Sequence, residues 1–210
     1  MRAETSIPVN EIIATRRSPR SFNEDIAISD IDLRAVLEAA RWAPSAFNGQ
    51  PWRYFVGKRG DETFTQILSS LVEFNQMWAH KASSLILVAS TTIKSDGTPH
   101  ADYQFDCGLS VAQLVIEAHD RGMVTHQMAG FDKATAKTAL SMDEALTPVV
   151  VIAVGTQDAP EKLAGPLLER EIAKREQSNN SLPPGHRIFL YCHRRTRRYL
   201  FLLHLRFLEY

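Results

Sequence analysis

Cysteine is scarce in this chain of 210 residues. Cys107 and Cys192 are its two cysteines, too few for a disulfide-rich scaffold or a four-cysteine zinc site. No apolar run approaches the roughly 20 residues that cross a bilayer, and the first ten residues lack the basic and apolar regions of a secretory signal. These absences predict reduced thiols, no membrane span and a cytoplasmic location.

Several catalytic signatures are also missing. The sequence contains no G-x-G-x-x-G, Walker loop, H-E-x-x-H, G-x-S-x-G or C-x-x-C motif. The spacing of His119 and His126 favours a helix-surface and a strand-end histidine over zinc ligands. Lys plus Arg equals Asp plus Glu at 24 each, so charge gives no reason to expect a nucleic-acid partner. We expect neither a metal site nor nucleic-acid binding.

The composition changes near the C-terminal end. Residues 186–210 contain six arginines against one acidic residue, Glu209, and follow a run rich in Ser, Asn, Pro and Gly over 178–185. The whole chain, at 44% apolar and 23% charged residues, has the composition of a globular protein. We expect one domain over residues 1–180 and an atypical basic, aromatic tail over 181–210.

Helical periodicity and capping residues predict several helices. Ser29 and Asp32 form a capping pair for a helix over 30–43, and Asp132 is a candidate N-cap for a helix over 133–140. Further helices are expected over 10–16 and 62–74.

A buried central helix is predicted from four apolar residues at helical spacing, with Gly122 after its end. These residues are Phe105, Leu109, Ala112 and Ile116. Strands are expected over 52–58, 84–90 and 148–155, the last two as apolar runs covered on both faces. Helices and strands interleave, which predicts an α+β domain.

Three local clusters carry groups suited to a ligand. Residues 16–20 (RRSPR) place three guanidinium groups and a hydroxyl together, as in a phosphate site or, alternatively, a solvated helix end. Residues 43–52 form a loop of small and hydrogen-bonding residues that could meet the polar edge of a flat ring, or an ordinary connection. Residues 125–131 contain Gly130, where a backbone can approach a ligand closely, or form a plain turn.

Together, in this order and spacing, the clusters resemble the nitroreductase family of FMN-dependent oxidoreductases over about residues 10–175. RRSPR resembles the family's RRSxR phosphate motif, residues 44–52 resemble its PSSxNxQPW loop, and residues 127–131 resemble the glycine-containing segment beside the flavin. The resemblance implies a mixed, mostly antiparallel sheet wrapped by helices. It also implies an intertwined homodimer with FMN at the subunit interface.

By the same resemblance, residues of both subunits bind the cofactor. The implied cofactor-binding residues are Arg16, Arg17, Ser18, Arg20, Ser45, Ala46, Asn48, Asn75, Gln127, Met128, Ala129, Gly130 and Arg175. The arginine-rich group would hold the phosphate and ribityl chain, Asn75 would meet the pyrimidine edge, and residues 127–130 would line the N5 side. Ser45, Ala46 and Asn48 would come from the other subunit.

The implied reaction is ping-pong: NAD(P)H gives a hydride to flavin N5, and a small flat acceptor such as a nitroaromatic, quinone or enone is then reduced. The cofactor carries this chemistry, so we nominate no side chain as general base or nucleophile. One alternative is a flavin carrier or adaptor of the same fold without turnover. Another is a flavin-fragmenting or dehalogenating relative.

The chain also departs from the family pattern. Ala46 replaces the second serine of the loop, and Gln113 stands where members often have Asn. Gln177 occupies the place of a second basic residue, which predicts a weaker phosphate grip unless Lys174 compensates. Residues 186–210 match nothing in the family, so they are an aberrant terminus, an arm that packs on the partner, or a basic surface anchor for anionic membrane.

Overall fold

The computed structural model describes residues 2–5, 7–94, 96–175, 189–194 and 197–202. The chain divides into two compact units, Met1–Lys174 and Arg175–Tyr210. The second unit contains an antiparallel hairpin, β5 (Phe189–Arg194) and β6 (Arg197–Leu202), which the sequence analysis did not predict. The rest of the predicted tail lies outside the described residues.

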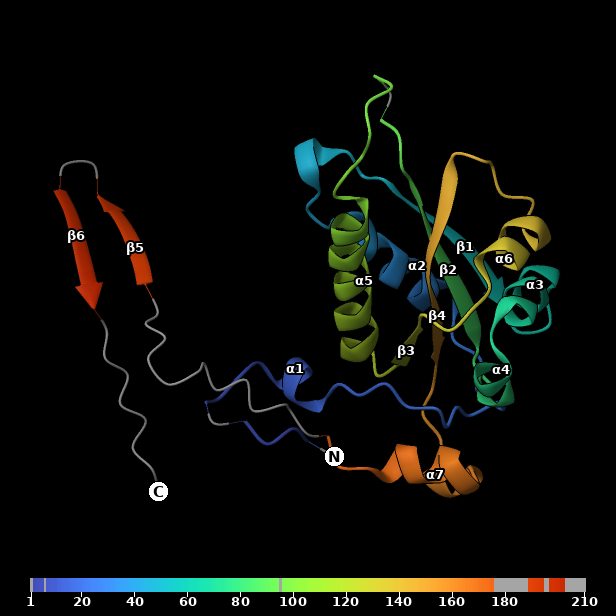
Figure 1. The fold of residues 1–210 in the computed structure, drawn as a ribbon. Coiled ribbons are helices and arrows are strands. Elements are labelled where there is room, and N and C mark those ends of the chain that lie inside the picture. Colours follow the sequence, from blue (N-terminus) through green and yellow to red (C-terminus); the bar gives the residue numbers. More distant parts are fainter. Residues whose placement is uncertain (1, 6, 95, 176–188, 195–196, 203–210) are drawn as a thin grey trace. The chain divides into compact units, whose positions relative to one another are not determined.

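The first unit is built on a four-stranded sheet (Figure 1). Its strands, in the order β1-β2-β4-β3, are β1 (Trp52–Lys58), β2 (Ser84–Thr91), β4 (Leu146–Gly155) and β3 (Val124–Met128). Every pairing among them is antiparallel, with Trp52 opposite Ser90 and Val124 opposite Gly155. The α+β architecture is confirmed, and β1 and β3 form opposite edges of the sheet.

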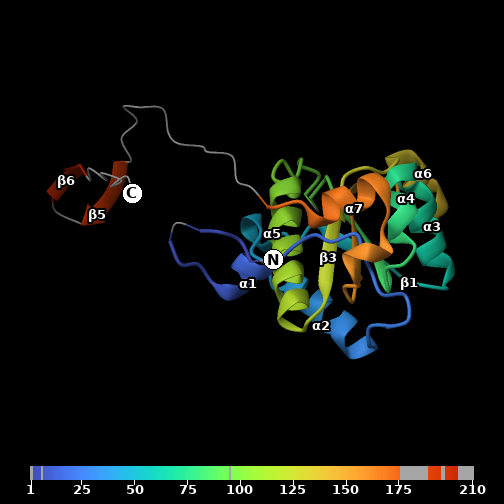
Figure 2. The same cartoon turned by 90° about the horizontal axis from the view of Figure 1, so that it is seen from below.

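Helices cover both faces of the sheet (Figures 1 and 2). On one face lie α2 (Asp30–Arg41) and α5 (Tyr103–Asp120). On the other lie α3 (Glu62–Ser70), α4 (Glu73–Ala79) and α6 (Lys133–Ala139). Short helical segments complete this unit: α1 (Glu11–Thr15), η1 (Ala46–Asn48), η2 (Pro160–Lys162) and α7 (Gly165–Ile172).

The central strand β2 belongs to two hydrophobic cores. Ile86 and Val88 pack with residues of α2 and α5, whereas Leu85 and Leu87 pack with residues of α3 and α4. Successive side chains of a strand point to opposite faces, so a strand covered on both sides must be apolar throughout. The prediction of a buried strand over residues 84–90 is therefore confirmed.

The predicted helix caps are confirmed. The Ser29 hydroxyl accepts a hydrogen bond from Asp32 N at 3.0 Å, and the Asp132 carboxylate accepts one from Thr135 N at 2.6 Å. Each bond satisfies a main-chain donor that has no partner within its helix. These local signals placed the starts of α2 and α6 from sequence.

The prediction of one helix over 62–74 was wrong, because the chain breaks into α3 and α4. Leu71 and Val72 are extended, with ψ of 149° at both. Leu71 pairs with Phe131, and Val72 N donates to Gly130 O at 3.1 Å. Pairing with a distant segment therefore overrides the local helical tendency.

The predicted buried face of the central helix was also wrong. Helix α5 exists and ends before Gly122, but Phe105 is 70% exposed and Ile116 is 44% exposed. The face that packs on the sheet instead carries Leu114 and Ala118. Both faces of this helix contain apolar residues, so periodicity alone could not identify the covered one. Phe105 and Ile116 are therefore exposed apolar residues on the outward face of α5.

A half-buried histidine, His126, attaches the segment over 16–20 to the edge strand β3. His126 Nδ1 lies 3.0 Å from the carbonyl oxygen of Pro19, and its ring packs 4.6 Å from that of Trp78. A carbonyl only accepts, so Nδ1 carries the proton in this contact. The pKa of His126 is lowered to about 4, mainly by desolvation; the hydrogen bond to the Pro19 carbonyl opposes this shift, and the positive charge of Arg20 adds to it.

We predict that Gly57→Ala destabilises the protein by about 1–3 kcal/mol. A Cβ at Gly57 would lie 2.2 Å from Phe64 N, so β1 and α3 would have to separate. Chemical unfolding measures the change. Ser69→Ala, on the exposed side of the same helix, should stay within about 0.5 kcal/mol of the wild type. Equal effects of the two variants would contradict the close-packing explanation.

We predict that His126 makes stability depend on pH between about 6.5 and 4. Its folded-state pKa is depressed, so its contribution is complete above the unfolded pKa of about 6.5 and is lost as the pH falls, by about 3 kcal/mol in total. Unfolding free energies measured from pH 8 to 4 should show a shallower fall for His126→Gln than for the wild type. His119→Gln, which leaves His126 in place, should keep the wild-type slope, and a parallel His126→Gln curve would refute the assignment.

Candidate functional site

The segment over 16–20 lies between β3 and α7. Arg17 Nη2 donates to the carbonyl oxygens of Glu171 at 3.2 Å and Ala173 at 3.0 Å, at the C-terminal end of α7. Arg16 Nη1 donates to Ser18 Oγ at 3.2 Å. A guanidinium carries five N–H donors, and Arg17 uses one nitrogen, Nη2, for both of these carbonyl oxygens. Sequence reasoning did not find the part that α7 plays in holding these arginines.

Arg20 has a buried donor that suits an anion. Its Nε is buried and has no hydrogen-bond partner among the described residues. The Glu171 carboxylate, which is 6% exposed, accepts from Arg20 N at 2.7 Å. Burial lowers the pKa of Arg20, and the negative charge of Glu171 opposes that shift. An unsatisfied buried donor is costly, so an incoming oxyanion would be stabilised here.

Gly130 and Asn75 are brought together from distant parts of the sequence. Asn75 Nδ2 donates to Gly130 O at 3.0 Å, and Val72 N donates to the same oxygen. A Cβ at residue 130 would lie 2.9 Å from Asn75 Nδ2 and 3.1 Å from Val72 Cγ2. Glycine is therefore needed here for a close approach. With Nδ2 engaged, Oδ1 of Asn75 remains as an acceptor.

The residues before Gly130 differ in what they can offer a ligand. Met128 is buried in the core at 3% exposure, so its main chain, rather than its side chain, can line a site. Gln127 Nε2 donates to Thr125 Oγ1 at 2.9 Å, and Ala129 is exposed. This part of the chain therefore presents mainly backbone.

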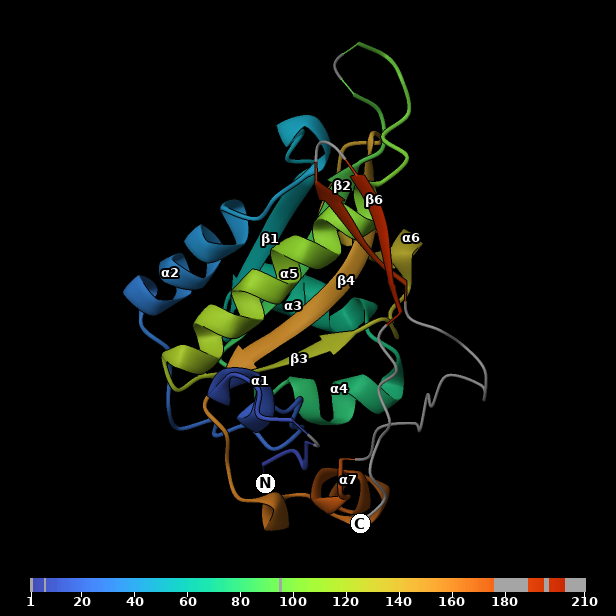
Figure 3. The same ribbon diagram turned by 90° about the vertical axis from the view of Figure 1, so that its left-hand side faces the viewer.

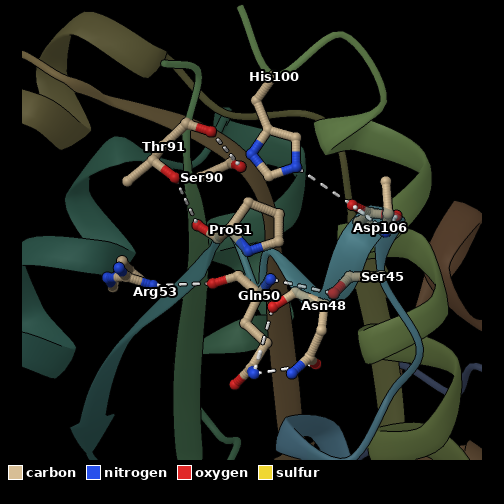
Figure 4. A network of polar contacts seen from close by, with 10 residues as sticks. Ser45, Asn48, Gln50, Pro51, Arg53, Ser90, Thr91, His100 and Asp106 are labelled. Atoms are coloured by element: carbon tan, nitrogen blue, oxygen red, sulfur yellow. Dashed lines mark hydrogen bonds and ion pairs between the residues drawn. The ribbon is translucent and has the colours of Figure 1, made fainter. Parts of the chain in front are cut away.

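The loop over 44–50 has an unusual backbone. Phe47, Asn48 and Gln50 have φ of 52°, 55° and 43°, in the left-handed region that non-glycine residues rarely adopt. Within the loop, Gln50 N donates to Ser45 Oγ at 3.0 Å, and Gln50 Nε2 donates to Asn48 Oδ1 at 3.0 Å (Figure 4). Ala46 N donates to the buried carboxylate of Asp106 on α5. Asp106 was not among the predicted residues.

The three clusters do not meet within one chain. The loop over 44–50 leads into β1, whereas the arginine segment and Gly130 border β3, at the opposite edge of the sheet. Three strand spacings of about 4.8 Å separate these edges. Figures 1 and 3 also show η1 at one end of the sheet and α4 and α7 at the other. Arg175 begins the second unit of the chain.

Two cavities lie beside the predicted site residues. A cavity of about 550 Å³ opens between the end of α2 and the loop, lined in part by Trp42, Pro44 and Asn48. A smaller one of about 260 Å³ lies beside Arg17 and His119. Within the described ranges, no three His, Cys, Asp or Glu side chains gather as a metal site requires. Among the helices described, none has the length and apolar character that a bilayer crossing demands.

Known proteins resemble this chain in sequence and fold. A model of the nitroreductase family matches residues 13–71. The crystal structure of an oxidoreductase containing FMN has a TM-score of 0.80 and 32% identity to this chain, with 88% of this chain and 95% of that chain covered.

Two curated relatives extend the match along the chain. YdgI of Bacillus subtilis (strain 168), provisionally named an NAD(P)H nitroreductase, is 27% identical over 69% of this chain and 86% of its own length. The CLA biosynthesis enone reductase of Lactiplantibacillus plantarum is 24% identical over 69% of this chain and 83% of its own length. With its motifs, its fold and these likenesses in agreement, the chain belongs to the nitroreductase family.

Proposed function

We propose that this protein is an FMN-dependent NAD(P)H oxidoreductase that works as a homodimer. The observation that carries the proposal is the alignment of two suitable groups along β3. The arginine segment is fixed to β3 by His126, and Gly130 with Asn75 follows the end of the same strand. The similarity to a crystallised oxidoreductase that contains FMN supports this cofactor.

The residues present fit such a cofactor. Arg16, Ser18 and Arg20 provide cationic and hydroxyl donors for a phosphate, and the buried Nε of Arg20 lacks a protein partner in the described part of the chain. Arg17 keeps α7 against this segment and adds positive charge. In this proposal Arg175 contributes a further cation, and residues 1–180 form the FMN-binding domain.

Asn75 and the backbone over 127–130 would receive the ring system. The amide of Asn75 is held by Gly130 O, which fixes its orientation before any ligand arrives. Gly130 has no side chain to keep a flat molecule away from the main chain. Main-chain groups of Gln127, Met128 and Ala129 would line the same surface.

FMN, when bound, would take reducing equivalents from NAD(P)H and pass them to a small flat acceptor such as a nitroaromatic, a quinone or an enone in two half-reactions. The chain's own part is to bind and orient. We assign no side chain the role of general base or nucleophile. The enone reductase among the relatives favours a conjugated acceptor.

A second copy of the chain would complete the site. Ser45, Ala46 and Asn48 lie at the sheet edge opposite the arginine segment, so they can act with it across an interface between two copies. The outward face of α5, with Phe105 and Ile116, provides an apolar surface for such an interface.

We predict that the purified protein, supplied with FMN, shows flavin absorbance that bleaches when NADH or NADPH is added without oxygen. Asn75→Ala should weaken FMN binding about tenfold, because one hydrogen-bonding group and its fixed orientation are lost. Gln66→Ala, which removes an amide that bonds Glu62 within α3, is the matched control and should bind like the wild type.

The proposed function would be overturned if the wild-type protein showed no bound flavin and no NAD(P)H-dependent bleaching. Steady-state turnover with a quinone then separates an enzyme from a flavin carrier of the same fold. A carrier would bind FMN without turnover.

We predict that Phe105→Glu converts the dimer to a monomer and lowers FMN affinity at least tenfold. A carboxylate on the apolar face of α5 would have to be desolvated in the interface. Light scattering during size-exclusion chromatography measures the mass, and fluorescence titration measures FMN binding. Ile31→Asp, on the exposed side of α2, should leave both unchanged. A Phe105→Glu dimer with wild-type affinity would contradict this interface.

A further inference from the structure

A buried carboxylate on α5 holds the start of the loop over 44–50. Asp106 is 2% exposed, and both of its carboxylate oxygens lie 3.2 Å from Ala46 N. Removing a carboxylate from water is expensive unless it gains charge-assisted or strong hydrogen bonds. Burial of the Asp106 carboxylate therefore lowers the stability of the fold, and it places a strong hydrogen-bond acceptor next to the loop.

A buried histidine packs on the same loop. His100 is 4% exposed, and its Nε2 lies 3.4 Å from Asp106 Oδ2. A Cβ at Gly49 would come 2.9 Å from His100 Cε1 and 3.2 Å from its Nε2, so the ring lies directly against this glycine. Gly49 has a negative φ of −69°, so closeness to the ring, rather than backbone conformation, accounts for glycine here.

His100 is itself firmly placed. Its main-chain N donates to Thr92 O at 2.8 Å, and its carbonyl oxygen accepts from Tyr103 N at 3.2 Å. The ring therefore joins the connection before α5 to the loop, while Asp106 joins the first turn of α5 to the same loop. The two residues contact opposite ends of η1, near Ala46 and Gly49.

We propose that His100 and Asp106 are positioning residues that hold the loop over 44–50 in its left-handed conformation. Neither touches the arginine segment or Asn75 through any contact of the described residues. They would act through the loop by fixing the places of Ser45 and Asn48. Their effect on the cofactor rests on the proposed function, whereas their effect on the loop does not.

The test compares four variants with the wild type. Asp106→Ala removes the acceptor of Ala46 N, and Asp106→Asn keeps an uncharged oxygen acceptor there. His100→Ala removes the ring beneath Gly49 without touching the Ala46 bond. Ser110→Ala is the matched control: it is buried one turn further along α5 and bonds Ala40 O and Tyr54 instead.

Two readouts are required for each variant. Amide hydrogen exchange over residues 45–50, measured without flavin, reports the loop itself. Fluorescence titration with FMN reports the dissociation constant. Thermal unfolding confirms that each variant is folded, and His100→Ala keeps the test possible where Asp106→Ala does not fold.

We expect Asp106→Ala and His100→Ala each to speed exchange in the loop at least tenfold and to raise the FMN dissociation constant at least tenfold. Asp106→Asn should recover most of both losses. Ser110→Ala should lower the unfolding temperature without changing either readout.

Unchanged loop exchange in Asp106→Ala and His100→Ala would overturn the proposal. Where Asp106→Ala does not fold, the decision rests on His100→Ala. Faster exchange with wild-type FMN affinity would overturn the role in cofactor binding. A wild-type protein that binds no FMN would defeat the proposed function, and the exchange measurement would still decide whether the pair holds the loop.

Discussion

The contact between His126 and the carbonyl of Pro19 determines where the candidate site lies. Residues 16–20 belong to no strand of the main sheet, so this contact and the bonds to α7 fix their position beside β3. Because burial and Arg20 both keep His126 neutral, the anchor adds no further positive charge to a segment that already holds three arginines. The buried carboxylate of Glu171 partly balances that segment. The charge left over is suited to a phosphate.

The sheet topology imposes the second constraint. Because β1 and β3 are opposite edges, the loop before β1 cannot reach the arginine segment of its own chain. The loop, with exposed Asn48 and Gln50, therefore lies apart from the arginine segment of its own chain. Two copies related by symmetry give each loop a partner, and the outward apolar face of α5 gives the copies a surface to share. Both features point to the same proposed assembly.

Local signals allowed much of the fold to be predicted, and distant contacts explain what was missed. Ser29 and Asp132 cap their helices through bonds three residues away, and a doubly covered strand is apolar throughout, so these elements were legible from sequence. The break at Leu71 arises from pairing with Phe131, which no local pattern encodes. In the site, the motifs gave the candidate residues. Their supports, such as Asp106, have no motif and become visible only through burial and contact.

The loop over 44–50 links its own geometry to the proposed interface. Its left-handed residues cost about 1 kcal/mol each, and Phe47, at 99% exposure, buries nothing in return. A Lys94 ammonium 5.8 Å from the Phe47 ring centroid offsets at most about 1 kcal/mol. Apolar burial within the chain therefore cannot hold this conformation, so polar contacts and the His100 ring must hold it. Because Asp106 lies on α5, the helix whose other face is proposed to meet the second copy, a shift of that helix would move the interface and the loop together.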